Sequence, residues 1–233
     1  MPLPHRMNAL LSLGRLAATS DIIDRLHRAI EKEITSASKR IESAARTGDS
    51  DYADGVTDDE CELVEQLLGL AFVAGQTFMT SVRTRIVRLS VACESQFGRP
   101  LTLGGNRGYD TFKVGASMQA GSGFTKAEVV NAIANYWKHQ EDWPTGEEAR
   151  GSRIVTVWDL TALRNNEKRT VEIVVGIGML PGNTGNLRSA ARVLGVTNFE
   201  DLSPIRQELH SWAQTVYTQT REELSTLAGS ADA

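Results

Sequence analysis

The chain is poor in the residues and patterns that mark specialised classes of protein. Its 233 residues include only two cysteines, which excludes a disulfide-rich scaffold, and its 25 basic and 29 acidic residues nearly cancel. A net charge of -4 gives no global basic field, so tight nonspecific binding to nucleic acid is not expected, although a local basic patch can still bind. Hydrophobic residues make up 41% of the chain, enough for one domain with a sizeable core.

The sequence also lacks a pattern typical of a signal peptide and a long run of apolar residues. The sequence has no cationic start followed by an apolar stretch and a cleavage site, and we find no run of about 18 apolar residues. We therefore expect a cytoplasmic protein without a membrane-spanning segment. Cys61 and Cys93 fall on one predicted helix, where a rise of ~1.5 Å per residue holds them about 48 Å apart and excludes a disulfide.

Apolar residues recur at spacings of three and four over much of the chain, which is typical of amphipathic helices. The first such helix is expected over 20–47, after a segment 1–19 that either forms a short docking helix or frays. The polar stretch 47–60 is rich in Asp, Gly and Ser and is expected to be a loop. A long central helix is then predicted over 58–97, apolar nearly all round in its first half.

Two threonines that precede a glutamate by three residues predict capping boxes at helix starts. Thr57 and Glu60 would begin the long helix. Thr125 and Glu128 would begin a further helix that ends near 143–144, where a proline stops it.

The remaining segments predict a mixture of helices and one strand. The glycine-rich stretch 98–123 is expected to be a loop with a short strand around 111–114, and it matches neither common phosphate-binding glycine motif. Alternating β-branched residues over 154–160 predict a short strand, although tertiary context could make it helical. Valines at helical spacing in 165–179 predict a helix, with a strand as the alternative.

Two more helices, over 186–195 and 203–228, complete the predicted architecture. The fold class is therefore all-α, a helical bundle with one long central helix and room for a minor β element. We expect a single domain over 20–228 and a disordered tail at 229–233.

The stretch ANYWKHQEDWP, residues 134–144, gathers aromatic, basic and acidic side chains near a helix end. Asn135 and His139 are four residues apart and share a face, Lys138 lies beside them, and Asp142 follows three residues later. A neutral imidazole at position 139 could act as a general base, oriented by the carboxamide or by a carboxylate. The alternative is that Tyr136, Trp137 and Trp143 wedge the helix end into the core while His139 hydrogen-bonds a backbone carbonyl.

Three arginines on the long helix could complete such a site. Arg83, Arg85 and Arg88 surround the less apolar side of the helix and could hold a phosphate next to His139. The alternative is that the three arginines form an ordinary solvent-exposed face of the long helix and bind nothing.

The Asn135-x-x-x-His139 pair on a bundle of this size resembles the HEPN superfamily of small bacterial helical domains, and NYWKHQEDW is similar to stretches in its members. The resemblance covers at most 58–179. It implies a four- to five-helix bundle, frequently dimeric and often tied to toxin–antitoxin or anti-phage systems, with metal-independent RNase activity in the active members. Asn135 and His139 carry over as the polar residue and the histidine of that motif.

The sequence departs from the active HEPN pattern at one position. Active members carry an arginine separated by four to six residues from a following histidine, and none of the chain's four histidines is preceded in this way. Arg206 and His210, for example, have only three residues between them. This departure puts nuclease activity in doubt.

Other chemistries find less support in the residue spacings. The ligand patterns of zinc and di-iron sites are absent, so we expect no metal and no cofactor. Glu62 and Glu65 begin a Glu-x-x-Glu pattern like that of all-α nucleotide pyrophosphatases, but the segment at Glu94 lacks the second acid. A serine-hydrolase elbow is also missing.

Two hypotheses of different classes follow. The favoured one is a non-catalytic helical binding module, a degenerate HEPN-like protein of a bacterial stress or defence system that binds a partner protein or RNA and could form a homodimer. The alternative is a HEPN-like metal-independent RNase or nucleotide-modifying enzyme. It would use His139 as acid and base, Asn135 to orient it, and Lys138 with the three arginines to bind the substrate.

Overall fold

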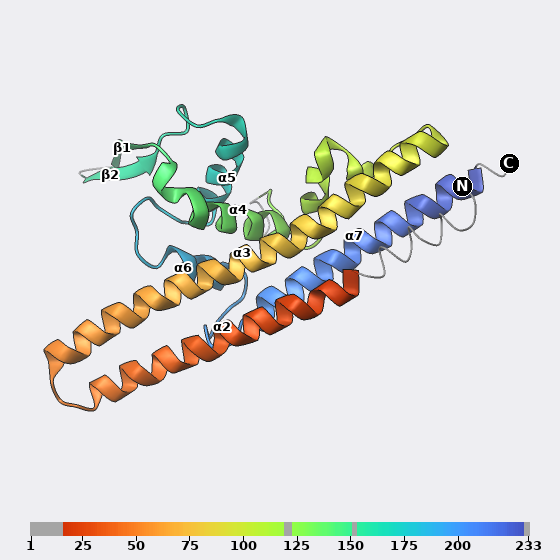
Figure 1. Ribbon diagram of the computed structural model, residues 1–233. Helices are drawn as coiled ribbons and strands as arrows, with labels where there is room; N and C mark the ends of the chain where they lie inside the picture. The colour runs from red at the N-terminus through yellow and green to blue at the C-terminus, as the bar shows by residue number, and fades with distance from the viewer. Residues whose placement is uncertain (1–15, 119–122, 151–152, 231–233) are drawn as a thin grey trace. The chain divides into compact units, whose positions relative to one another are not determined.

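A computed structural model describes residues 16–118, 123–150 and 153–230 of the chain (Figure 1). These residues are mainly helical, with one long helix and one small antiparallel sheet, so the predicted fold class is confirmed. Two compact units can be recognised. The first contains the described parts of Met1–Asp24, Gly75–Glu128 and Arg206–Ala233, and the second those of Arg25–Ala74 and Val129–Ile205. The single domain expected over 20–228 stays a prediction.

Helices α2 (Leu16–Ala45) and α3 (Ser50–Phe97) begin earlier than the sequence predicted. The stretch 47–60 is therefore mostly helix, and its prediction as a loop was wrong. The Asp49 side chain accepts the Tyr52 N–H at 3.1 Å and caps α3, whose acidic first turns suit the positive end of a helix dipole. The predicted Thr57 capping box is also wrong, because the Thr57 hydroxyl lies inside α3 and donates to Ala53 O at 2.8 Å.

In the second unit, α2 and the first half of α3 run antiparallel and are joined by a short loop (Figure 1). Arg40 of α2 donates two hydrogen bonds to the Glu60 carboxylate of α3 and fixes their register. This ion pair lowers the pKa of Glu60 below its usual value. Farther along, buried His27 donates from Nε2 to Ala71 O at 3.1 Å.

The rest of the second unit is built on shorter elements. Helix α4 (Lys126–His139) enters it and continues into the 3-10 turn η3 (Gln140–Asp142), so α4 ends a few residues before the predicted 143–144. Strands β1 (Thr145–Arg150) and β2 (Arg153–Trp158) form an antiparallel hairpin with Thr145 opposite Trp158. Helices α5 (Asn165–Gly176) and α6 (Asn186–Val193) follow.

Most predictions for these shorter elements are confirmed. The strand at 154–160 is β2, and 165–179 contains the helix α5 rather than the alternative strand. The capping box at the start of α4 is also present: Thr125 N–H donates to Glu128, and Glu128 N–H donates to the Thr125 hydroxyl, each at 3.1 Å. The polar strand β1 was missed.

The first unit packs around Trp212 of α7 (Ser203–Ser230), which is 1% exposed. Its ring lies edge-on to Phe78 of α3 and stacks on Phe112, and its Nε1 donates to Thr111 O at 2.8 Å. Thr125 donates to Phe112 O. These two carbonyls are therefore not available to pair with a neighbouring strand. The segment forms the 3-10 turns η1 (Thr102–Gly104) and η2 (Asn106–Lys113), and the predicted strand at 111–114 was wrong.

Helix α3 carries both cysteines and the most apolar segment of the chain. Cys61 and Cys93 are free thiols, as predicted, and burial raises the pKa of Cys93. Among the described helices, α3 alone has a stretch long and apolar enough to cross a membrane by length and composition. The expectation of a chain without a membrane-spanning segment stays a prediction. Of this stretch 44% is buried inside the structure, and core helices of soluble proteins meet the same criterion.

Candidate functional site

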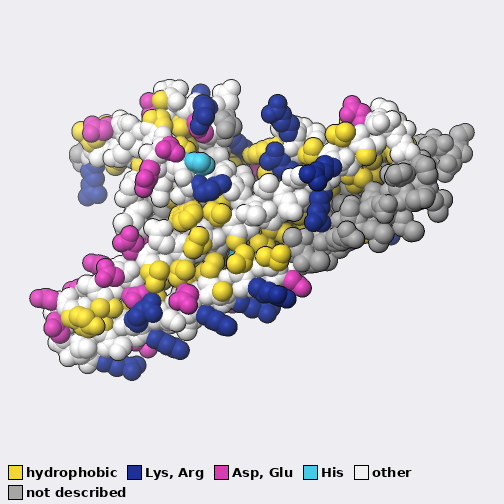
Figure 2. Space-filling view, viewed as in Figure 1, with side chains coloured by type: hydrophobic (Ala, Val, Ile, Leu, Met, Phe, Trp, Pro, Cys, Tyr) yellow, Lys and Arg dark blue, Asp and Glu magenta, His cyan; other side chains and the backbone are white. Residues whose placement is uncertain are grey.

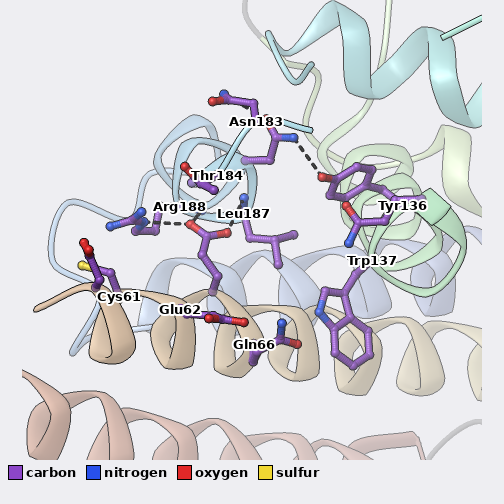
Figure 3. A pocket seen from close by; sticks show the side chains of 14 residues that line it. Cys61, Glu62, Gln66, Tyr136, Trp137, Asn183, Thr184, Leu187 and Arg188 are labelled. Atoms are coloured by element: carbon purple, nitrogen blue, oxygen red, sulfur yellow. Dashed lines mark hydrogen bonds and ion pairs between the residues drawn. The ribbon is translucent and has the colours of Figure 1, made fainter. Parts of the chain in front are cut away.

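A cavity of about 620 Å³ opens in the second unit between α3, the end of α4 and the loop that leads into α6 (Figure 3). Helix α3 lines it with Asp58, Cys61, Glu62, Glu65 and Gln66. The opposite walls come from Tyr136, Trp137 and Gln140 and from residues 183–188. The cavity therefore combines carboxylates, amides and an aromatic wall, groups that can hydrogen-bond or attract a polar ligand.

Glu65 connects α3 to the first turn of α6. Its carboxylate accepts the backbone N–H groups of Leu187 and Arg188 at 2.9 and 3.3 Å, and the Arg188 Nε at 2.7 Å. Burial alone would lower the pKa of Arg188, but the hydrogen bond and charge of Glu65 raise it, so the guanidinium stays charged. Since this carboxylate already satisfies the N–H groups at the start of α6, the helix end offers no vacant anion site.

Asn186 holds the α6 loop against α4 from inside the protein. Asn186 is 2% exposed, and its Nδ2 donates to the Tyr136 hydroxyl at 2.8 Å and to Leu180 O at 2.7 Å. The first of these bonds is the dashed line that ends at Tyr136 in Figure 3. The Leu180 N–H donates in return to Asn186 Oδ1 at 3.3 Å. Burial raises the pKa of Tyr136 above its usual value, which keeps the phenol neutral. These bonds fix the shape of the cavity wall.

Trp137 forms the aromatic wall because α3 has a glycine opposite it. A Cβ at Gly69 would lie 2.2 Å from Nε1 of Trp137, so the indole ring can rest against the α3 backbone only at this residue. Trp137 itself is half-buried, while Gln66 of α3 lies near the ring (Figure 3). The sequence pattern placed Trp137 in the core, but its ring lines the cavity.

The side of the cavity toward the start of α3 is acidic. Asp58 and Glu62 are both exposed, and within the described part of the chain neither has a hydrogen-bond or ion-pair partner. Their two negative charges lie on the same α3 surface as Glu65, whose charge is balanced by Arg188. The unbalanced carboxylates favour a positively charged ligand.

Three aromatic rings pack against one another next to the cavity. Tyr136, Trp143 and Trp158 are buried, and their ring centroids lie 5.8 to 6.0 Å apart with edge-on or tilted contacts. A smaller hollow of about 360 Å³ adjoins them and shares Tyr136, Gln140 and Asn183 with the main cavity. The aromatic wedge considered above as the alternative for the end of α4 thus describes Tyr136 and Trp143, whereas Trp137 lies elsewhere.

The predicted catalytic residues lie outside this cavity. His139 is at the end of α4 with its side chain 55% exposed, and its Nδ1 is 3.6 Å from the Asp142 carboxylate. Asn135 is half-buried and Lys138 is exposed on the same helix, and desolvation lowers the pKa of Lys138. None of the three lines either cavity.

The predicted phosphate-binding arginines belong to the other unit. Arg83 donates from Nε to Arg107 O at 2.9 Å, and its guanidinium lies over the Phe112 ring. Arg85 and Arg88 lie on the same part of α3. Since His139 and Asn135 belong to the second unit, neither unit by itself contains the site predicted from these residues.

Reasoning from the sequence missed the residues that shape the cavity. Asn186, Arg188 and Gly69 carry no sequence motif, because their roles depend on contacts between residues about 50 to 120 positions apart. The acids of α3 could have been found, since they recur at helical spacing. The prediction of a loop at 47–60 concealed that spacing.

Comparisons with known proteins do not assign the chain to a family. No protein-family model, no curated protein and no solved structure matches the chain. Within the described residues, no group of three His, Cys, Asp or Glu side chains is arranged to hold a metal ion.

Proposed function

We propose that this protein is a non-catalytic helical binding module whose recognition site is the cavity between α3, α4 and α6. The cavity accepts a positively charged group of its partner, an ammonium or a guanidinium. The observation that carries this proposal is the position of Glu62, an exposed carboxylate without an ion-pair partner among the described residues, in the lining of the cavity that Gln66 and Trp137 also line.

The chemistry of the cavity favours a cation over an anion. Glu62 and Asp58 attract positive charge, and the face of the Trp137 ring can stabilise a cation by its π electrons. The positive group among the described lining residues, Arg188, is bound to Glu65 and leaves little charge for an anion. Gln66, Gln140 and Thr184 supply neutral groups that can hydrogen-bond the N–H donors of a ligand.

The walls are also held in place before any ligand arrives. Glu65 fixes the first turn of α6, and Asn186 fixes the preceding loop to Tyr136. A preorganised site loses less conformational entropy on binding than a flexible one. This arrangement suits the recognition of a ligand. Glu65, Asn186 and Tyr136 hold the cavity walls in place and take no part in a reaction.

Titration of N-acetyl-L-arginine amide into the protein tests this proposal, with binding followed by calorimetry. We expect saturable binding to the wild type and a loss of about fivefold or more in affinity for Glu62→Gln, which removes the charge and keeps the size. Glu147→Gln, at an exposed position of strand β1 that does not line the cavity, is the control and should bind like the wild type. Absence of binding to the wild type would contradict the proposal.

One observation favours a second candidate function, that of an enzyme. His139 is exposed and lies beside Asp142, as a metal-independent RNase or nucleotide-modifying enzyme would need. Incubation of the wild type and of His139→Ala with total RNA in the presence of chelator tests it on a denaturing gel. Cleavage that disappears in the variant would establish the RNase and replace the binding module as the main function.

The biological setting is also a proposal. The Asn135-x-x-x-His139 spacing on a helical fold supports a degenerate HEPN-like protein of a bacterial stress, toxin–antitoxin or anti-phage system. The partner in that setting would be a protein with a basic surface, because the cavity repels the phosphates of RNA.

A further inference from the structure

Five acidic residues form one continuous row on α3 that leads into the cavity. Asp51, Asp54, Asp58, Glu62 and Glu65 follow one another at spacings of three, four, four and three residues. At ~100° per residue these positions lie within about 80° of one another around the helix axis. Figure 2 shows acidic side chains gathered at the end of the helical hairpin where α3 begins.

The charges of this row are unbalanced at its first four positions. Asp51, Asp54, Asp58 and Glu62 are exposed, and no described residue forms an ion pair or hydrogen bond with any of their side chains. From residue 49 to residue 82 the chain has no lysine or arginine at all. Three arginines of the second unit pair with other acids: Arg40 with Glu60, Arg46 with Glu42 and Arg188 with Glu65.

The helix dipole explains only the start of this row. An acid in the first turn, such as Asp51, is stabilised by the positive end of the helix. Asp58 and Glu62 lie beyond that turn, and like charges four residues apart destabilise a helix. The row therefore costs stability in the isolated chain, a cost that a positively charged partner would offset.

We propose that the partner is a protein that presents an extended segment rich in arginine or lysine, which lies along the acidic row and places one basic side chain in the cavity beside Trp137. This inference rests on the proposed function, because it names the partner for the same cation site. Charge complementarity selects a basic protein segment over RNA, whose phosphates the row would repel.

The dimensions agree with such a segment. From Asp51 to Glu62 the row extends about 17 Å along the helix, at ~1.5 Å per residue. An extended peptide advances ~3.3 Å per residue, so basic side chains at alternate positions lie about 7 Å apart, and their long side chains can reach acids that follow one another every ~4.5–6 Å along the helix. Six peptide residues cover the row, with the last basic side chain at the entrance between Asp58 and Glu62.

Fluorescence anisotropy of a fluorescein-labelled Gly-Arg-Gly-Arg-Gly-Arg-Gly peptide tests the inference at low ionic strength. We expect the peptide to bind the wild-type chain more tightly than N-acetyl-L-arginine amide does. The same peptide with citrulline in place of arginine, which has the same shape without the charge, should not bind. The variant Asp51→Asn with Asp54→Asn changes the row outside the cavity and should weaken peptide binding about fivefold while leaving the amide unaffected.

A matched pair of acids outside the row provides the control. Glu33→Gln with Glu147→Gln removes two charges from exposed positions on α2 and β1 and should leave peptide affinity within about twofold of the wild type. Equal peptide affinity for the wild type and the Asp51/Asp54 variant, with the amide still bound, would overturn the peptide inference and leave the cation site intact. Binding of a fluorescein-labelled single-stranded RNA oligonucleotide, without the peptide, that is lost in Glu62→Gln would also overturn it. Failure of both peptide and amide to bind the wild type would overturn the proposed function as well.

Discussion

The Glu65 carboxylate accepts the backbone N–H of Leu187 at 2.9 Å, so a side chain of α3 caps a helix that begins 121 residues later in the sequence. No residue next to α6 provides this cap, since Gly185 precedes it without a side chain. Glu65 therefore helps to position α6, and with it one wall of the cavity, together with the bonds of Asn186.

Replacement of this acid should destabilise the second unit. Glu65→Ala leaves the N–H groups of Leu187 and Arg188 without their acceptor and removes the partner of the Arg188 guanidinium. We expect the free energy of unfolding, measured by urea denaturation, to fall by about 1–3 kcal/mol. Glu62→Gln, three residues earlier on the exposed side of the cavity, should change it by less than about 0.5 kcal/mol. Equal effects of the two would refute the capping role.

Tyr136 should make stability depend on alkaline pH. Tyr136→Phe removes the bond to Asn186 and should cost about 0.5–1.5 kcal/mol at neutral pH. Burial raises the pKa of Tyr136 in the folded chain, so above the unfolded value of about 10 the unfolded state loses its proton first and the wild type loses stability as the pH rises. Phenylalanine does not titrate, and the difference between the two proteins should shrink above pH ~10. A difference that is constant with pH would contradict the assignment.

Replacement by alanine should have different effects at two glycines of α3, because only one of them lies against a side chain. Gly69→Ala places a methyl group against the Trp137 ring, which must move, so we expect altered tryptophan fluorescence and weaker binding of arginine amide. Gly55→Ala meets nothing within 4 Å and should stabilise the chain by about 0.5–1 kcal/mol with unchanged fluorescence. Unchanged fluorescence in both variants would show that Trp137 does not rest on Gly69.

The acidic row should be stabilised by removal of one charge. Asp58 has acids four residues away on both sides, so Asp58→Asn relieves two repulsions and should raise the free energy of unfolding by about 0.5 kcal/mol. The gain should disappear at high salt, which screens exposed charges. A gain that is independent of salt would point to another cause.

The elements that the sequence predicted well are those governed by local signals. The start of α4 follows from the reciprocal bonds of Thr125 and Glu128, and α5 follows from its regularly spaced valines. The loop prediction at 47–60 failed because Asp, Gly and Ser also favour turns, while the Asp49 cap and the helix dipole stabilise an acidic first turn.

The candidate site could not be predicted from local signals. Asn135 and His139 were chosen for their spacing on one helix, yet the cavity depends on Gly69, Glu65 and Asn186, which meet their partners only in the folded chain. The prediction of Trp137 as a core residue failed for the same reason, because the space for its ring is created by a glycine on a different helix.

Tryptophan indole N–H signals in a nitrogen-proton correlation spectrum can locate the binding site. The chain has four tryptophans, and the Trp137 signal can be assigned as the one that is lost in Trp137→Phe. Buried Trp212, which donates to Thr111 O in the first unit, serves as the internal reference. On addition of N-acetyl-L-arginine amide, we predict a saturable shift of the Trp137 signal and a constant Trp212 signal. A Trp137 signal that does not move, or one that moves no more than that of Trp212, would contradict a cation site beside Trp137.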